Sequence, residues 1–217
     1  MSAREQTLGR ARRALSDVTI EDPIVDVPID RPRQSSGRSP EQIVDLFAER
    51  VADYRAGVAK ATTPHVASAV SRALQNAAAG GNTVLRVVVP PGFPVEYLPD
   101  SIEVVTDGPD VPVAVLDRCD GVVTTAAVGI AETGTIVLDH GPGQGRRAAT
   151  LVPDVHVCVI EEARVIAGIP ESVSVLDPRR PQTWISGPSA TSDIELDRVE
   201  GVHGPRTLQV VIVTAEG

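Results

Sequence analysis

The chain has 217 residues, which is enough for one sizeable α/β domain with a hydrophobic core and too few for two full domains. Aromatic residues make up only 2% of the chain, so a core drawn from its 42% of hydrophobic residues is mostly aliphatic. The formal net charge of −9 argues against a general affinity for nucleic acids or for anionic membranes, because both require a basic surface.

The two cysteines, Cys119 and Cys158, lie far apart and form no Cys-x-x-Cys pair. The chain alone therefore cannot supply the thiolates of an iron–sulfur cluster or of a structural zinc site, and we expect both side chains to be small and buried. The first residues are charged and lack the apolar centre of a secretory signal, and no stretch approaches ~18 consecutive apolar residues. We expect a cytoplasmic protein with no membrane insertion.

Residues 1–38 are predicted to form an N-terminal helix and a flexible arm. Apolar side chains at helical spacing, Leu8, Ala11 and Leu15, predict a short arginine-rich amphipathic helix over residues 2–15. The stretch after it is rich in proline and acidic residues and contains no pattern of packed regular structure. The folded domain is therefore predicted at residues 39–217.

Two helices are predicted at the start of this domain. Ser39 can cap the first, a proline takes its first helical position, and its apolar periodicity reaches about Ala61. The second helix begins near Thr63 and ends before the pair Gly80 and Gly81.

Short β-branched runs bounded by glycine and proline follow, and they predict the strands of a sheet. They lie at residues 83–90, 102–106, 120–129, 134–140, 155–161 and 207–214. Helical or irregular connections separate most of them, whereas the third and fourth runs are close enough to be antiparallel neighbours. The pattern predicts an α/β fold with a mixed, mostly parallel sheet between helices.

The turn before residues 134–140 is the first candidate for chemistry. Glu132 at the end of a sheet could act as a base, a nucleophile or a ligand contact. The predicted substrate-binding residues beside it are Thr133, Gly134 and Thr135. The alternative is that these residues only make the turn and that Glu132 is solvated.

The stretch "DHGPGQGRR" at residues 139–147 is the second candidate. Backbone N–H groups freed by glycine, with Arg146 and Arg147 behind them, could cradle a phosphate or a carboxylate. The glycine spacing matches neither the dinucleotide-binding fingerprint nor the P-loop, so a surface loop without a ligand is the alternative.

The closing segment, residues 184–205, is the third candidate. Ser192 and Glu195 have the spacing of a capping box, which predicts a short helix whose free amides favour an anion. Asp193 and Glu195 would repel that anion unless Arg198, Arg206 or a metal compensates, and both acids could instead only improve the cap.

His203 lies in a glycine- and proline-rich loop of the same segment. It could act as an acid or base near neutral pH, or it could simply hydrogen-bond to a neighbouring carbonyl. The other predicted substrate-binding residues of the segment are Ser186, Gly187, Ser189, Thr191 and Gly204.

Four motifs in this order resemble those of a known family. They are "AREQTLGRARRAL" near the start, "GIAETGTIVL" (129–138), "RRAATLVPDVHVCVIEEARVI" (146–166) and "ISGPSATSDIELDRVEGVHGPRTLQVVIV" (185–213). Together they are similar to the lactate utilization protein C family, which is built on the lactate-utilization (LUD) domain, and the resemblance spans residues 40–214.

The resemblance implies a fold like that of the sugar-phosphate isomerase and CoA-transferase superfamily, a Rossmann-like α/β sandwich of three layers. It also implies a role in oxidising L-lactate to pyruvate together with two iron–sulfur partner proteins. The clusters would then reside in the partners, and no cofactor or metal is expected in this chain.

The leading hypothesis is therefore a component of an L-lactate oxidation system whose pocket takes a small carboxylate or phosphate. The predicted catalytic residues are Glu132, Asp193 and His203. The predicted anion-binding arginines are Arg146, Arg147 and Arg206. The alternatives are a stand-alone CoA-transferase-like enzyme with Glu132 as nucleophile, and a non-catalytic module whose arm docks the iron–sulfur partners. Formation of a homo-oligomer is left open.

Overall fold

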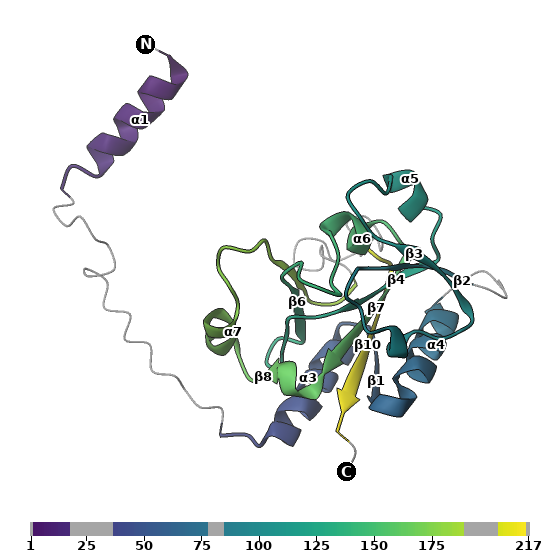
Figure 1. The fold of residues 1–217 in the computed structure, drawn as a ribbon. Coiled ribbons are helices and arrows are strands. Elements are labelled where there is room, and N and C mark those ends of the chain that lie inside the picture. The colour runs from purple at the N-terminus through teal and green to yellow at the C-terminus, as the bar shows by residue number, and fades with distance from the viewer. Residues whose placement is uncertain (1, 18–36, 78–84, 189–203, 216–217) are drawn as a thin grey trace. The chain divides into compact units, whose positions relative to one another are not determined.

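The structure is a computed structural model that describes residues 2–17, 37–77, 85–188 and 204–215 (Figure 1). The chain divides into two units, Met1–Gln34 and Ser35–Gly217. The smaller unit contains helix α1 (Ala3–Ala14), which begins with a capping box. In it the Glu5 amide donates to Ser2 Oγ at 3.2 Å, and the Ser2 amide donates to Glu5 Oε2 at 2.7 Å. The predicted N-terminal helix is present, and none of its side chains is buried.

A six-stranded sheet forms the centre of the larger unit (Figure 1). Its strands lie in the order β1-β10-β7-β4-β2-β3, and all neighbouring strands are parallel. Their bounds are β1 (Gly57–Thr62), β2 (Leu85–Val89), β3 (Ile102–Thr106), β4 (Gly121–Thr125), β7 (Val155–Glu161) and β10 (Thr207–Thr214). The inner strands are rich in valine and mostly buried, as expected of parallel strands covered on both faces. The predicted α/β fold with a mostly parallel sheet is confirmed.

A second sheet of four strands continues directly from the first. Its order is β8-β5-β6-β9, with antiparallel pairs β5–β6 and β6–β9 and a parallel pair β5–β8. The bounds are β5 (Val128–Ile130), β6 (Thr135–Leu138), β8 (Val165–Ile166) and β9 (Thr183–Ile185). Only Ala126 and Ala127 separate β4 from β5, so the run predicted as one strand at 120–129 is two strands, one in each sheet.

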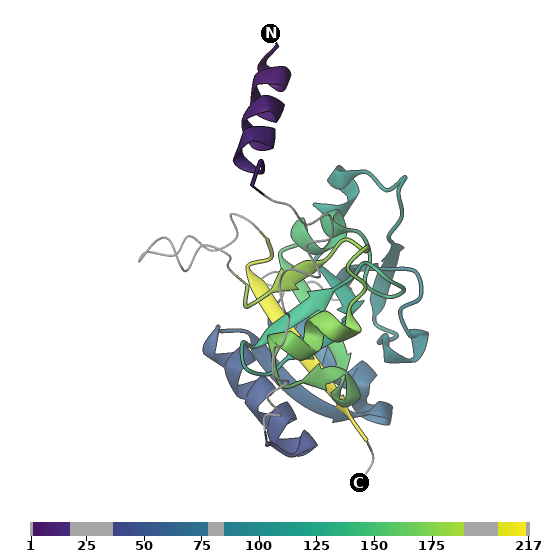
Figure 2. The same cartoon turned by 90° about the vertical axis from the view of Figure 1, so that its left-hand side faces the viewer.

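Helices cover both faces of the large sheet. The α-helices of this unit are α3 (Pro40–Asp53), α4 (Val66–Ala77), α5 (Val113–Leu116), α6 (Arg147–Leu151) and α7 (Ile169–Val175), and the 3-10 turns are η1 (Thr63–His65), η2 (Val95–Tyr97) and η3 (Glu162–Arg164). Helix α4 packs on one face, while α3, the small sheet, α5 and α6 cover the other. Figure 2 views the unit from the side of α7, which lies against β5 of the small sheet. Within the described ranges, no helix combines the length and apolar character needed to cross a membrane.

The first helix of the domain is shorter than the sequence predicted. It ends at Asp53 instead of near Ala61, because Arg55 adopts a φ of 61° that right-handed helices do not accommodate. The residues after it form β1, an edge strand paired with β10. Its sequence, "GVAKAT", contains alanine and lysine in place of a β-branched run, and this is why its strand character was missed.

Candidate functional site

A cavity of about 370 Å³ lies at the carboxyl end of the large sheet. The chain proceeds from β2 outward to β3, but from β4 it proceeds to β7 and β10 in the opposite direction, so β2 and β4 flank a topological switch point. Ligands of open parallel sheets bind in the crevice outside the strand ends at such a point. Part of the cavity lining comes from the ends of β4 and β7 and from the segments that follow β2 and β4. These residues are Gly92, Pro94, Tyr97, Thr125, Ala126, Ala127, Val159 and Glu161.

Two glycine-containing loops pack against each other to form one wall. The Gly143 amide donates to the Pro91 carbonyl at 2.8 Å, and the Gly143 carbonyl accepts from the Thr125 amide at 2.8 Å. Gly143 has a φ of 77°, and a Cβ there would lie 2.8 Å from Thr125 Oγ1. Glycine is therefore required by both the backbone conformation and the close approach.

The backbone amides of the loop Asp139–Gly145 are largely used inside the protein. Asp139 N donates to Gln144 Oε1 at 2.6 Å, and Gly141 N donates to Asp139 Oδ1 at 3.1 Å. Gln144 N donates to the Gly141 carbonyl at 3.1 Å, and the Gly143 amide is bound as described above. These four N–H groups do not form the anion cradle that glycine spacing alone allowed.

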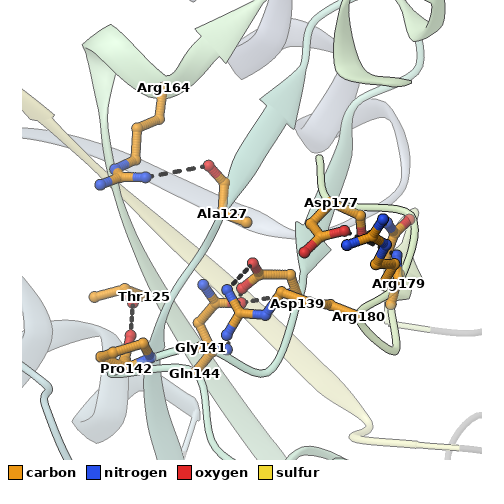
Figure 3. Close-up of polar contacts among 11 residues, drawn as sticks. Thr125, Ala127, Asp139, Gly141, Pro142, Gln144, Arg164, Asp177, Arg179 and Arg180 are labelled. Atoms are coloured by element: carbon orange, nitrogen blue, oxygen red, sulfur yellow. Dashed lines mark hydrogen bonds and ion pairs between the residues drawn. The ribbon is translucent and has the colours of Figure 1, made fainter. Parts of the chain in front are cut away.

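Two arginines, Arg164 and Arg180, and two carboxylates, Asp139 and Glu161, give the cavity its charge. Figure 3 shows both arginines and Asp139. Arg180 Nη1 donates to Asp139 Oδ2 at 2.6 Å. Arg164 Nε lies 3.8 Å from Glu161 Oε2, and its Nη1 donates to the Ala127 carbonyl at 3.4 Å. The Arg180 and Arg164 side chains are 42% and 56% exposed, respectively. A guanidinium has five N–H donors, so both arginines can bind an incoming anion while they keep these contacts.

His140 holds the loop Asp139–Gly145 in place through both of its ring nitrogens. Its backbone has a φ of 57°, which is uncommon for a residue other than glycine. Nδ1 lies 2.8 Å from the Gly145 carbonyl and therefore carries the proton in that contact, because a carbonyl only accepts. Nε2 lies 3.0 Å from Thr183 Oγ1, which attaches the loop to β9.

A tyrosine supplies a hydrogen-bonding group to the cavity. Tyr97 is nearly buried and contacts Phe93 edge to face, with the ring centroids 6.4 Å apart. Burial, helped by the carboxylates of Glu161 and Glu96, raises the pKa of Tyr97 above its ordinary value. The phenol is therefore protonated at neutral pH and can donate a hydrogen bond.

Comparison with known proteins identifies the family. Residues 114–213 match the LUD domain, a range that runs from α5 into β10. A Deinococcus radiodurans protein named lactate utilization protein C is 46% identical over 176 residues, which cover 79% of this chain and 80% of the relative. The chain belongs to the lactate utilization protein C family. A Bacillus pumilus member is 39% identical over 84 residues, 35% of either chain.

The fold of this LUD protein is also similar to a solved structure. The crystal structure of a DUF162 family protein from Deinococcus radiodurans matches with a TM-score of 0.69 and 39% sequence identity. The match covers 81% of this chain and 99% of that one.

Glu132 of the LUD domain is exposed and does not line the cavity. It lies in the turn between β5 and β6, where its amide donates to the Ala167 carbonyl at 3.0 Å. Its carboxylate approaches Gly168, so closely that a Cβ there would lie 2.7 Å from Oε2. Gly168 precedes the first turn of α7, and a carboxylate near a helix N-terminus stabilises the helix by about 0.3–1 kcal/mol. The position of Glu132 thus has a structural explanation.

The neighbouring hydroxyls form a closed cluster. Thr135 Oγ1 lies 2.7 Å from Thr133 Oγ1 and 2.7 Å from Ser186 Oγ. Gly134 packs on α3, and a Cβ at Gly187 would lie 2.6 Å from Tyr54 Cβ. These predicted substrate-binding residues do come together, but they bond one another and the protein outside the cavity.

The three predicted arginines do not line the cavity. Arg146 Nε donates to buried Asp107 at 2.8 Å, and its Nη2 donates to the Val111 carbonyl at 2.5 Å. Arg147 is exposed at the start of α6. Arg206 pairs with Asp154 on the surface, and the hydrogen bond to Asp154 raises the pKa of the guanidinium. A Cβ at Gly204 would lie 3.7 Å from Leu151 Cδ2, an ordinary van der Waals contact.

The remaining predicted site residues lie outside the described residues. They are Ser189, Thr191, Asp193, Glu195 and His203, together with the capping residue Ser192. Their predicted roles remain predictions.

None of the predicted site residues that the structure describes lines the cavity, and reasoning from sequence missed its residues Tyr97, Thr125, Glu161, Arg164 and Arg180. Thr125 and Glu161 are the last residues of β4 and β7, so the rule that ligands bind at the carboxyl ends of parallel strands could have found them. Arg180 follows α7 in an irregular segment, and no spacing in the sequence relates it to Asp139.

A metal site is not formed by the described residues, in which no three His, Cys, Asp or Glu side chains gather closely enough to hold an ion.

His156 and Cys158 of β7 are buried titratable groups. His156 Nε2 lies 2.8 Å from Thr124 Oγ1, and burial lowers the pKa of His156 to about 4. Burial raises the pKa of Cys158 to about 12, although a hydrogen bond from Thr124 opposes it. Both cysteines are free and buried, as predicted.

Proposed function

We propose that this protein takes part in lactate utilization and that its cavity binds a small 2-hydroxy- or 2-oxocarboxylate such as L-lactate or pyruvate. The relationship to the Deinococcus radiodurans lactate utilization protein C supports the role. One observation carries the site: two partly exposed arginines border a cavity at the switch point of a parallel sheet.

The cavity offers a partner to each group of such a ligand. The planar guanidinium of Arg180 or Arg164 suits a carboxylate in a bidentate contact. The Tyr97 phenol and the Thr125 hydroxyl can donate to a ligand oxygen, since Thr125 Oγ1 makes only a long contact of 3.5 Å with the Pro142 carbonyl. Asp139 can accept the hydrogen bond of a 2-hydroxyl group. A volume of about 370 Å³ is within the range of small-molecule sites.

We further propose that the redox centres of the system reside in iron–sulfur partner proteins. An iron–sulfur cluster requires about four thiolate ligands, and this chain has 2 cysteines, both buried. The pKa of about 12 for Cys158 opposes the thiolate form that a cluster requires. The residues of this chain do not fit a cluster, which supports placing the electron acceptor in a partner.

The role is tested by deleting the gene in the source organism and measuring L-lactate oxidation in extracts. We expect oxidation to disappear and to return with the intact gene. Arg164→Gln should fail to restore it at normal protein level, because Arg164 lines the cavity. Arg147→Gln is the matched control, since Arg147 is an exposed arginine outside the cavity.

The outcomes separate the role from the site. If deletion leaves L-lactate oxidation unchanged, the proposed role is wrong. If deletion abolishes oxidation but Arg164→Gln restores it as well as Arg147→Gln does, the role stands and the proposed site is wrong.

A further inference from the structure

The loop Asp139–Gly145 supplies a large part of the cavity wall, so its position decides the shape of the proposed ligand site. The residues of this loop that line the cavity are Asp139, Gly141, Pro142 and Gln144. Gln144 is buried, and its Oε1 accepts from the Asp139 amide at 2.6 Å. Asp139 in turn accepts from Arg180 at 2.6 Å (Figure 3). The position of the Arg180 guanidinium therefore depends on where the loop lies.

Asp107 holds the far end of this loop, although it does not line the cavity itself. It follows β3 directly, and its amide donates to the Val89 carbonyl at 3.0 Å, which attaches it to the end of β2. Its carboxylate accepts twice from Arg146: Oδ1 from Nε at 2.8 Å and Oδ2 from the backbone amide at 3.1 Å. Arg146 Nη2 also donates to the Val111 carbonyl at 2.5 Å. The residue directly after the loop is therefore bound through both its backbone and its side chain.

Gly145 brings the loop very close to the ends of β2 and β3. It has a φ of 72°, and a Cβ there would lie 2.8 Å from Pro90 Cγ and 3.3 Å from Asp107 Oδ2. The Gly145 carbonyl accepts from His140 Nδ1 at 2.8 Å, which ties the two ends of the loop together. Asp107 therefore lies against the loop that it binds, and a shift of its carboxylate would shift the loop.

The Asp107 carboxylate is costly to bury. Its side chain is only 3% exposed, whereas Glu103 of β3, which pairs with Arg86 Nε at 2.9 Å, is 59% exposed. Desolvation of a buried ion pair can cost more than the attraction returns, and apolar residues of similar size often stabilise a fold as well or better. Stability alone is therefore a weak explanation for the pair of Asp107 and Arg146, and placement of the loop is a stronger one.

We propose that Asp107 is a positioning residue of the ligand site. Through Arg146 its carboxylate holds the loop Asp139–Gly145, and with it Asp139 and Arg180, in the arrangement that binds the carboxylate of the ligand. Asp107 does this without contacting the ligand. This role rests on the ligand site proposed above.

The test compares Asp107→Asn with a matched variant, Glu103→Gln, in the full-length protein. Each substitution keeps the size of the side chain and removes the charge of one β3-side partner of an arginine. We expect Asp107→Asn to weaken the binding of L-lactate or pyruvate by about tenfold or more in a calorimetric titration. Glu103→Gln should change the affinity by less than about twofold, because its pair is exposed and remote from the loop.

Amide hydrogen exchange without ligand separates positioning from stability. In Asp107→Asn the amides of Asp139, Gly141 and Gln144 should exchange about tenfold faster or more, because the loop opens locally. The amides of β7 should change less, since their exchange requires a larger opening of the sheet.

Arg146→Gln tests whether Asp107 acts through Arg146. It should weaken ligand binding about tenfold in the wild-type protein, but by less than about twofold when Asp107→Asn is already present. Arg146→Lys keeps the positive charge and loses the forked contact, so it should show a smaller loss in the same direction. It replaces Asp107→Asn in the comparison if that variant does not fold.

Three outcomes would overturn the proposal. They are unchanged ligand affinity in the folded variants, additive losses in the double variant, and equal acceleration of exchange in the loop and in β7, which would show that the pair only stabilises the fold. If the wild-type protein binds neither L-lactate nor pyruvate, the ligand assigned under the proposed function is wrong. The exchange of the loop amides then decides by itself whether Asp107 holds the loop.

Discussion

Two polar regions with similar residues have different surroundings in this protein. In the closed cluster, the hydroxyls of Thr133, Thr135 and Ser186 bond one another, and glycines bring the chain against α3. In the loop Asp139–Gly145, glycines again allow a close approach, but Arg180 beside it extends into a cavity. Glycine and short polar residues therefore indicate that a backbone is approached closely, and only the fold decides whether protein or ligand approaches it.

The largest effect is expected at Gly134 of the closed cluster. Its φ is 58°, and a Cβ would lie 2.6 Å from the Arg50 carbonyl carbon and 2.8 Å from the Val51 amide nitrogen. Gly134→Ala should therefore lower the free energy of unfolding by about 3 kcal/mol or more, as backbone strain and overpacking add. Urea unfolding measures this, and Gly108→Ala, with nothing within 4 Å, is the control. Equal stability of the two variants would show that the cluster is not tightly packed.

The stability of the protein should depend on pH through the buried side chain of His156. The pKa of His156 is about 4 in the folded protein and 6.5 in the unfolded chain, so only the unfolded chain gains a proton as the pH falls through this range. Stability is fully present above pH 6.5 and should decrease by about 3 kcal/mol down to pH 4. His156→Gln should remove this part of the pH dependence, whereas His65→Gln, at an exposed histidine, should retain it. Parallel urea unfolding series at pH 7 and 5 compare them, and identical slopes would contradict the burial of a neutral imidazole.

A substitution in the cavity should change ligand binding instead of the stability of the fold. Arg164→Gln should weaken L-lactate or pyruvate binding by about 10- to 100-fold, the effect of losing a charge-assisted hydrogen bond. The free energy of unfolding should change by less than about 1 kcal/mol, because the pair with Glu161 is exposed. Calorimetric titration and urea unfolding of one preparation measure both. If Arg164→Gln lowered the stability but left ligand binding intact, Arg164 would have a structural role and the proposed ligand site would be wrong.

The smallest effect is expected at Thr135. Thr135→Val removes the hydroxyl that joins Thr133 and Ser186, and it should cost about 1–2 kcal/mol of stability. Ligand binding at the cavity should remain unchanged, because Thr135 does not line it. Calorimetric titration and urea unfolding measure both effects. Reduced ligand affinity at unchanged stability would instead show that the closed cluster contributes to ligand binding.

The sequence predicted the fold far better than the site. Runs such as Val155–Glu161 and Thr207–Thr214 predicted their strands to the residue, because β-branched side chains buried on both faces produce a continuous apolar pattern. β1 was missed because an edge strand needs no such run. The cavity is formed by parts as distant as Tyr97 and Arg180, whose proximity depends on strand order. Strand order follows from long-range pairing, which local spacing does not encode.

The position of β10 has a consequence for how the protein is made. β10 lies between β1 and β7, and β1 pairs with no other strand of the large sheet, so Gly57 finds its partner only in Gln209. During synthesis β1 emerges early and has no strand to pair with until nearly all the chain described here has left the ribosome. The large sheet therefore cannot close co-translationally by adding strands in order. Its assembly should be a late, cooperative event, because β1 pairs only after β10 has been made.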